Sequence, residues 1–190
     1  MQFIQAKNYT AVPAGRSVEL VVIHTMEAAE KPGTALAVAR WFSGPTAPKA
    51  SAHYCIDNVD VVQSVREKDV AWAAPGANRN AVHLEHAGFA GQSTQNWADA
   101  YSLAMLQKSA GLCADICHRH GIPVVRLTPA DLLAKKRGIC GHIDVTKAFK
   151  KSTHVDPGKN FPWDAYLELV RAALADLQRD DDEAPTKPIV

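Results

Sequence analysis

The chain has 190 residues, of which 47% are hydrophobic and 22% charged, a balance typical of one soluble globular domain. Lys and Arg number 21 against 20 Asp and Glu, so no net field favours nucleic acid or an anionic membrane as the main partner. No stretch approaches the roughly 18 apolar residues that a membrane span requires. The start, MQFIQAKNYTAVPAG, lacks the basic and apolar regions of a secretory signal, so we expect synthesis in the cytoplasm without a signal peptide.

In the first half of the chain, short apolar runs alternate with turn residues. Residues 18–25, VELVVIHT, predict a buried strand that ends at His24. A helix-like run, ALAVARWFSG, follows and closes at Gly44. Three further strands are predicted, the first two as a hairpin across the turn NVD: residues 51–57, 61–66 and 81–87.

In the second half, helical patterns predominate. Residues 97–120 carry apolar side chains at helical spacing until Gly-Ile-Pro stops the pattern. The run PVVRL, residues 123–127, predicts a strand, and TPADLLAKKRG predicts a helix with Thr128 as N-cap that stops at Gly138. The last helix is expected to begin near Pro162.

Because strands and helices are interleaved with connections long enough for crossovers, the pattern predicts an α/β fold. We expect a single domain with a mixed sheet of about five to six strands, flanked by helices, over residues 1–178. Residues 179–190 are charged, contain proline and show no periodicity, which predicts a polar linker or tail.

Four scattered cysteines form no CxxC pair, and a cytoplasmic chain of this size needs no disulfides. Cys113 and Cys117 are four residues apart in a helical pattern, where two thiolates can share a metal. The sequence favours buried free thiols, since cysteine is among the most commonly buried residues.

Three residues from separate segments offer the ligand types of a catalytic zinc site. His24 ends the first strand, His142 lies in CGHID and Asp156 lies in STHVDPGKNFPW. Catalytic zinc takes three protein ligands and leaves a fourth position for water. Spacing alone does not show that the three converge, and Asp-Pro-Gly is equally typical of a simple turn before a helix.

Five motifs together resemble the zinc-dependent N-acetylmuramoyl-L-alanine amidases of the type 2 class, which includes phage endolysins, peptidoglycan-recycling amidases and peptidoglycan recognition proteins. In chain order these motifs are VVIHTM, SAHYCID, NAVHLEH, GHIDV and THVDPGKNFPW, and the resemblance covers about residues 18 to 175. It implies a zinc cleft on a mixed sheet and cleavage of the amide between N-acetylmuramic acid and the L-alanine of the stem peptide. It also implies one Zn²⁺ per chain, held by His24, His142 and Asp156.

The same resemblance implies catalytic roles for two further side chains. Glu85 in VHLEHA matches the glutamate that takes a proton from the zinc-bound water and passes it to the leaving nitrogen; the alternative is a surface glutamate on an edge strand. His154 stands where the family often has lysine or threonine, which helps to hold the developing oxyanion. As a hypothesis, activity falls as pH rises through the pKa of His154.

Departures from the family pattern concern residues near these motifs. Ala52 replaces a tyrosine that some phage members use, which gives Glu85 more weight, and His53 is interpreted as a hydrogen-bonded structural histidine. His83 shares a strand face with Glu85, so His83 and Trp72 are candidate substrate-lining residues; a structural role for His83 is the alternative. Three basic residues, Lys147, Lys150 and Lys151, are expected in a loop between the second and third ligands. They either form a solvated face of the loop or attract the anionic cell wall.

The resemblance favours the catalytic domain of an endolysin. Such a protein is made in the host cytoplasm, acts on bacterial peptidoglycan after release and lyses the cell wall. We expect a monomer, with a cell-wall-binding module that can follow Val190. The alternatives are a cytoplasmic recycling amidase that cuts soluble muropeptides and a binding module without activity. All three ligand positions and Glu85 are present, which argues against the binding module.

Overall fold

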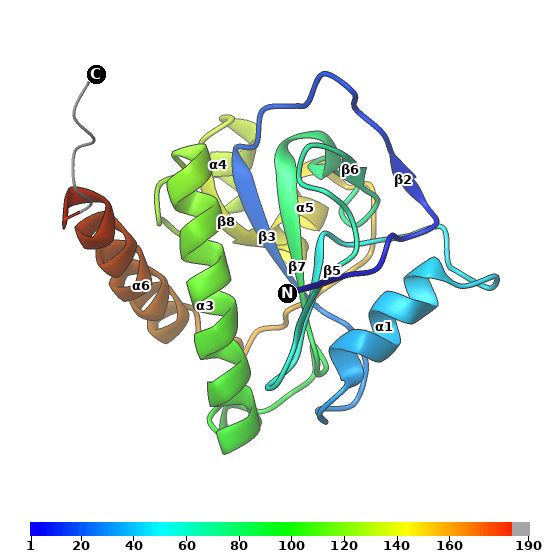
Figure 1. Ribbon diagram of the computed structural model, residues 1–190, viewed down its shortest axis with the longest axis horizontal. Helices are drawn as coiled ribbons and strands as arrows, with labels where there is room; N and C mark the ends of the chain where they lie inside the picture. Colours follow the sequence, from blue (N-terminus) through cyan, green and yellow to red (C-terminus); the bar gives the residue numbers. More distant parts are fainter. Residues whose placement is uncertain (184–190) are drawn as a thin grey trace, which may run out of the picture.

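The core of the computed structural model, which describes residues 1–183, is a mixed sheet of six strands (Figure 1). Its strands are β1 (Gln2–Phe3), β3 (Leu20–Thr25), β4 (Tyr54–Ile56), β5 (Val61–Gln63), β7 (Ala81–His86) and β8 (Gly138–Gly141). They lie in the order β1-β5-β4-β7-β3-β8, and only the β4–β5 hairpin is antiparallel. A separate pair joins β2 (Tyr9–Thr10) to β6 (Val70–Ala71). The predicted α/β fold and the hairpin are confirmed.

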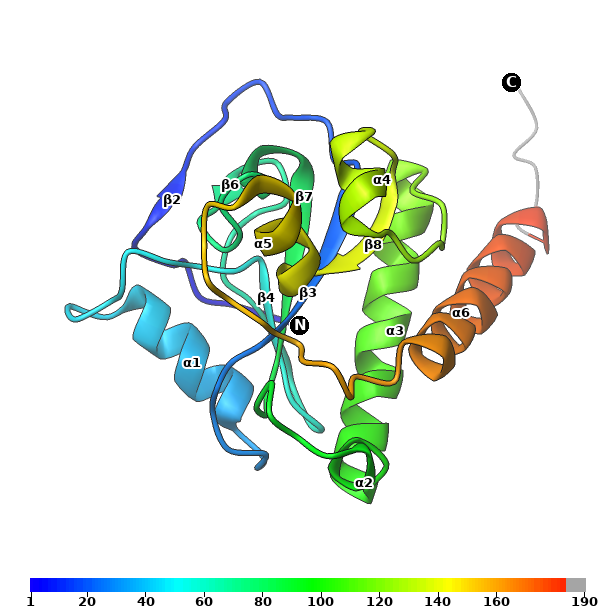
Figure 2. The same ribbon diagram turned by 180° about the vertical axis from the view of Figure 1, so that it is seen from behind.

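Six α-helices flank the sheet within the described residues. They are α1 (Thr34–Ser43), α2 (Thr94–Trp97), α3 (Ala100–His120), α4 (Pro129–Leu133), α5 (His142–Phe149) and α6 (Trp163–Glu183). Figures 1 and 2 show the long helices α3 and α6 running side by side, well separated from α1. None of the helices between residues 1 and 183 is both long and apolar enough to cross a membrane.

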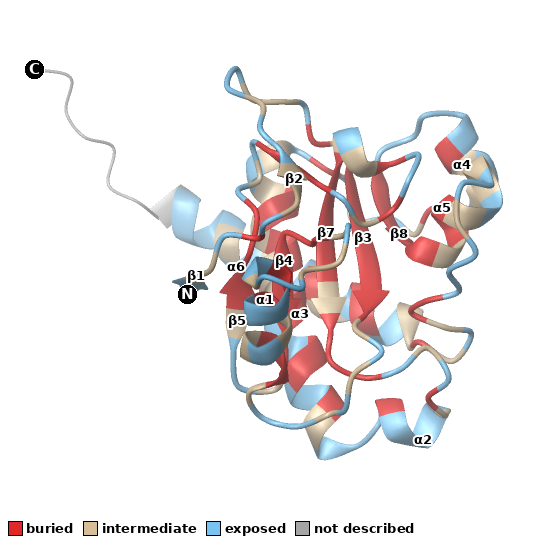
Figure 3. Ribbon diagram, turned by 90° about the vertical axis from the view of Figure 1, so that its right-hand side faces the viewer, coloured by how far each residue is buried: buried red, intermediate tan, exposed pale blue. Residues whose placement is uncertain are grey.

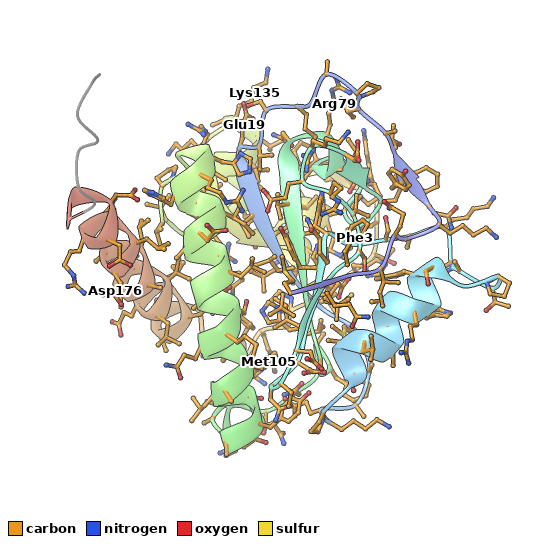
Figure 4. All side chains as sticks on the ribbon, viewed as in Figure 1. Phe3, Glu19, Arg79, Met105, Lys135 and Asp176 are labelled. Carbon is orange, nitrogen blue, oxygen red and sulfur yellow. The ribbon has the colours of Figure 1, made fainter. Side chains whose placement is uncertain are left out.

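Alternating residues of β3 pack into opposite layers, as the two-residue period of a strand requires. Val21 and Ile23 join the core formed with α3 and α6, whereas Leu20 and Val22 pack beneath α4 and α5. Figure 3 shows β3, β7 and β8 as a buried centre with exposed surfaces on the helices around it. In Figure 4, Met105 lies on α3, and its side chain is fully buried in the first of these cores.

Two predictions around residue 130 are wrong in detail. The run at 123–127 is not a strand and makes only one isolated bridge, between Arg126 and Ile139. The strand in this region is β8 (Gly138–Gly141), which the sequence analysis did not predict. Helix α4 has the expected Thr128 cap but ends at Leu133, and Lys135 adopts the left-handed φ of 57°. Residues 138–141 therefore form a strand because they pair with β3 at the edge of the sheet, and not because of their own β propensity.

The segment between the second and third candidate ligands begins as a helix, so the predicted loop is confined to residues 150–155, which include Lys150 and Lys151. Helix α5 begins directly at His142, where the Asp144 carboxylate accepts a hydrogen bond from the Gly141 N–H at 2.8 Å. Lys147 lies on this helix, and Lys150 ends it in the left-handed conformation. At the other end of the chain, α6 continues to Glu183, so the predicted tail is helical in its first five residues. Residues 184–190 of that tail lie outside the described residues.

Candidate metal centre

The two candidate histidine ligands lie at the carboxyl ends of neighbouring parallel strands. Strand β3 pairs with β8 up to Ile23 and Gly141, so His24 in β3 lies next to His142, the first residue after β8. Ligand sites gather at the carboxyl ends of parallel strands. The sheet register therefore brings together two histidines that are 118 positions apart in the chain.

Asp156 meets both imidazole rings from the segment that follows α5. Its Oδ2 lies 3.0 Å from Nδ1 of His24, and its Oδ1 lies 3.2 Å from Nδ1 of His142. One ligand atom from each of the three residues lies within 4.8 Å of the others, and all three side chains are buried. The predicted convergence is confirmed, and Asp156 does more than form a turn.

Two glycines allow the backbone around Asp156 to pack this closely. Gly158 adopts φ 89°, and a Cβ there would lie 1.9 Å from the carbonyl oxygen of Ala90. A Cβ on Gly141 would lie 2.8 Å from Cδ of Pro157. The Ile143 N–H also donates a hydrogen bond to the Asp156 carbonyl at 2.9 Å. The start of α5 and the Asp-Pro-Gly turn are thereby held together.

The three residues fit a divalent metal such as zinc. Each histidine uses its Nε2 atom to contact another protein group. Nε2 of His24 lies 3.1 Å from Nδ1 of His83, and Nε2 of His142 lies 3.3 Å from Oγ of Ser152. Both Nδ1 atoms therefore face Asp156 and remain for a metal. Burial alone would raise the pKa of Asp156, but hydrogen bonds with His142 and His24 hold it well below its usual range. Burial lowers the pKa of His24, which favours the neutral ring that a metal binds.

Glu85 stands beside His24 on the neighbouring strand. The register pairs these two residues directly, and β7 lies in the interior of the sheet, so the reading as a glutamate on an edge strand is wrong. Its Oε2 is buried and has no hydrogen-bond partner among the described residues. Burial, followed by the nearby Asp156 and Glu27 carboxylates, raises the pKa of Glu85 well above its usual value. A carboxyl group with a raised pKa in a cleft is a candidate for proton transfer.

An open cleft of about 300 Å³ lies over these groups. Its lining combines the three candidate ligands and Glu85 with an apolar wall that contains Trp41, Phe42 and Trp72. Trp41 is 51% exposed, and the Trp72 indole N–H donates a hydrogen bond to Thr10 Oγ1 at 2.9 Å. Trp41 thus lies at the cleft rather than in the core.

His154 also lines the cleft and lies next to the candidate ligands. Its ring stacks on that of His142 with centroids 4.4 Å apart, and its Nδ1 lies 3.4 Å from Oδ1 of Asp156. The side chain is 65% exposed. The structure thus places His154 in the cleft, beside His142 and Asp156.

The prediction that His83 lines the cleft is wrong. Its side chain is fully buried, and it lies behind His24, where the register pairs it with Val22 one row further from the strand end. His53 is a buried, hydrogen-bonded residue, as predicted, because its Nδ1 accepts the His83 N–H at 3.1 Å. The sequence analysis gave no role to Glu27 or to Ser152. Glu27 belongs to none of the five motifs, and Ser152 opens the stretch STHVDPGKNFPW, but nothing in that stretch marks its contact with Nε2 of His142.

Cys113 and Cys117 are buried free thiols on α3, as expected, and pack in the core with α6. Within residues 1–183, the cluster of His24, His142 and Asp156 is the one group of three or more residues placed to hold a metal. The cysteines are therefore part of the packing.

A cleft over two histidines, an aspartate and a buried glutamate, at the strand ends of a mixed sheet, defines an α/β protein with a candidate hydrolytic metal centre. The chain belongs to the N-acetylmuramoyl-L-alanine amidase family: the family model Amidase_2 matches residues 14–159. It is 32% identical over 178 residues to N-acetylmuramoyl-L-alanine amidase A of Achromobacter lyticus, covering 87% of this chain and 89% of that protein.

Solved structures share the fold at low sequence identity. The Staphylococcus aureus hydrolase AmiA superposes with a TM-score of 0.68 at 15% identity, covering 97% of this chain and 86% of that one. AmpD superposes with a TM-score of 0.62 at 18% identity, covering 91% of this chain and 93% of that one. A mutant endolysin from Bacillus subtilis gives 0.59 at 16% identity, with coverage of 90% and 99%. This chain thus shares its fold with AmiA, AmpD and an endolysin.

Proposed function

We propose that this family member is a zinc-dependent peptidoglycan hydrolase that cleaves the amide between N-acetylmuramic acid and the L-alanine of the stem peptide. The observation that carries the proposal is the convergence of His24, His142 and Asp156 in a cleft that also contains Glu85. Zinc bound there would lower the pKa of a water molecule to about 7 and polarise the amide carbonyl. Two neutral imidazoles and one carboxylate leave such a site with a net charge of about +1, which favours this chemistry.

Glu85 moves the proton in this reaction. Its carboxylate accepts a proton from the attacking water and then delivers it to the nitrogen of L-alanine, because an amine leaves poorly unless it is protonated. The unpartnered Oε2 and the raised pKa support this role, since a carboxyl group with an ordinary pKa would hold the proton too weakly.

His154 and the aromatic wall position the substrate. His154 donates a ring N–H to the carbonyl oxygen as negative charge develops there, and its exposed ring beside Asp156 supports this role. Trp72 and Trp41 offer apolar faces on which the sugar ring packs. These contacts would hold the scissile amide between Glu85 and the three ligands.

In the cell, the proposed role is that of an endolysin: a monomer made in the host cytoplasm that degrades the cell wall after release and lyses the host. The similarity to a protein named as an endolysin supports this proposal. A cell-wall-binding module following Val190 would fit the same role. Cleavage of soluble muropeptides in the cytoplasm is the nearest alternative, and the structural similarity to AmpD is compatible with it.

The two roles differ in the physical state of the substrate. The protein is incubated in parallel with suspended sacculi and with soluble muropeptides that carry the same linkage. An endolysin clears the suspension at a rate comparable to its cleavage of fragments. Cleavage of soluble fragments with no loss of turbidity would contradict the endolysin role and favour recycling. Binding to sacculi without any product would identify a binding module instead.

A further inference from the structure

His83 contacts the candidate ligand His24 on the side that faces away from Asp156. The Nδ1 of His83 lies 3.1 Å from Nε2 of His24, and the two ring centroids are 5.2 Å apart. His83 itself is fully buried and does not reach the cleft. It cannot touch substrate, so any effect that it has on the reaction passes through His24.

The direction of this hydrogen bond follows from the other contacts of His24. Since Nδ1 of His24 faces Asp156, a neutral His24 that offers Nδ1 to a metal carries its proton on Nε2. That N–H donates to Nδ1 of His83, which must therefore be unprotonated. A neutral His83 ring whose Nδ1 accepts this hydrogen bond holds its one proton on Nε2.

The surroundings of His83 hold its ring in one orientation. His53 stacks on it at 5.5 Å with an interplanar angle of 18°, and its Nδ1 accepts the His83 main-chain N–H. On its other side, Nε2 of His53 lies 3.2 Å from the Asp69 carbonyl oxygen and 2.9 Å from the Arg16 guanidinium. Arg16 donates to the carbonyl groups of Glu67, Asp69 and Ala81. A buried polar chain thus runs from Arg16 to His24.

One feature of His83 argues against a role in stability. Its Nε2 is buried and has no hydrogen-bond partner among residues 1–183. An unsatisfied buried donor costs about 1–3 kcal/mol, so an apolar side chain of similar size would suit the packing better. Among residues 1–183, the hydrogen bond with His24 is the one side-chain hydrogen bond of this ring, and it gives a physical reason for an imidazole at this position.

We propose that His83 is a positioning residue: its Nδ1 accepts the Nε2–H of His24 and thereby fixes the tautomer and ring orientation in which Nδ1 of His24 binds zinc. This inference rests on the proposed function, because it requires a metal at the three-ligand site. Protein groups that hold a ligand in this way typically contribute 10–100-fold to metal affinity.

Two substitutions of nearly equal shape test the proposal. In His83→Asn the amide oxygen can replace Nδ1 as acceptor, whereas His83→Leu has no acceptor. We expect His83→Leu to bind zinc about 10–100-fold more weakly than the unsubstituted protein, and His83→Asn to stay within about 3-fold. Zinc affinity is measured on the metal-free proteins by competition with a chromophoric chelator, after circular dichroism has established that each variant is folded.

A matched control is Val82→Ala, which alters another fully buried side chain of β7, on the opposite face and in the core with α3 and α6. This variant should keep its zinc affinity. Unchanged affinity in a folded His83→Leu variant, or an equal loss in Val82→Ala, would overturn the inference. If the unsubstituted protein binds no zinc, both the proposed function and this inference are refuted. If it binds zinc and His83→Leu binds equally tightly, only the inference falls.

A second measurement needs no variant. In the zinc-loaded protein, nitrogen-detected NMR of the imidazole rings should find His83 in the Nε2–H tautomer and His24 with its proton on Nε2. A proton on Nδ1 of His83 would contradict the proposal even if His83→Leu fails to fold.

Discussion

Glu67 joins the segment after the β4–β5 hairpin to the end of α3, and we predict that its charge stabilises the fold. Its carboxylate accepts hydrogen bonds from Arg119 Nη1 at 2.8 Å, from His120 Nε2 at 2.7 Å and from Tyr54 Oη at 2.5 Å. Burial alone would raise the pKa of Glu67, but the hydrogen bonds from Arg119, Tyr54 and His120 outweigh it and lower the pKa from 4.5 to about 2.

The size and sign of the effect follow from that pKa. A lowering of the pKa from 4.5 to about 2, at about 1.4 kcal/mol per pKa unit, corresponds to at most about 3.5 kcal/mol. Because the Arg119 side chain is 42% exposed and its charge is screened by solvent, we reduce this to about 2 kcal/mol. The folded pKa lies below the unfolded one, so this stability is present above pH 4.5 and is lost as pH falls to about 2.

Glu67→Gln removes the charge and keeps the shape, and should therefore lower the free energy of unfolding by about 2 kcal/mol at pH 7. The assay is urea unfolding followed by circular dichroism at several pH values between 2 and 7. The difference from the unsubstituted protein should shrink steadily below pH 4.5. Glu168→Gln, at an exposed position on α6, serves as the control and should stay within about 0.5 kcal/mol. Equal stability at pH 7, or a difference that does not change with pH, would refute this reasoning.

Three further predictions concern the site. Gly158→Ala places a Cβ at a left-handed φ and against the Ala90 carbonyl oxygen. It should lower the free energy of unfolding by about 2 kcal/mol or more and weaken zinc binding, and an unchanged melting temperature would contradict this. Glu85→Gln should keep a full zinc content by elemental analysis but lose about 100-fold or more in turnover; retained turnover would remove Glu85 from the proton transfer. Trp41→Ala should raise KM several-fold with little change in kcat or zinc content, and a fall in kcat alone would place Trp41 elsewhere in the reaction.

The parts of the fold that the sequence predicts well are those with a strong local signal. The β-branched run ending at His24 and the long apolar stripe of α3 both carry enough pattern to define their elements. Strands β1, β2 and β6 have two residues each and exist only through their partners. The segment GICG of β8 is half glycine, yet it forms a strand because it lies beside β3. Tertiary pairing here overrides local propensity.

The candidate site shows the same division. The family motifs predict the three residues that converge, since each motif marks a strand end or a turn. The shared face of His83 and Glu85 also follows from the two-residue period of a strand. Which of the two reaches the cleft depends on the register of β7 against β3, which pairs Glu85 with His24 and places His83 one row behind. No local pattern in the sequence encodes that register.

The central claim is that the three-ligand cluster supports amide cleavage in peptidoglycan. The most direct measurement is the release of new α-amino groups on L-alanine and of new reducing sugar ends from purified peptidoglycan, with and without a metal chelator. We predict alanine amines without reducing ends, loss of that release with chelator, its recovery on adding zinc, and no release from Asp156→Ala. New reducing ends, or alanine release that persists in the Asp156→Ala protein, would contradict the account.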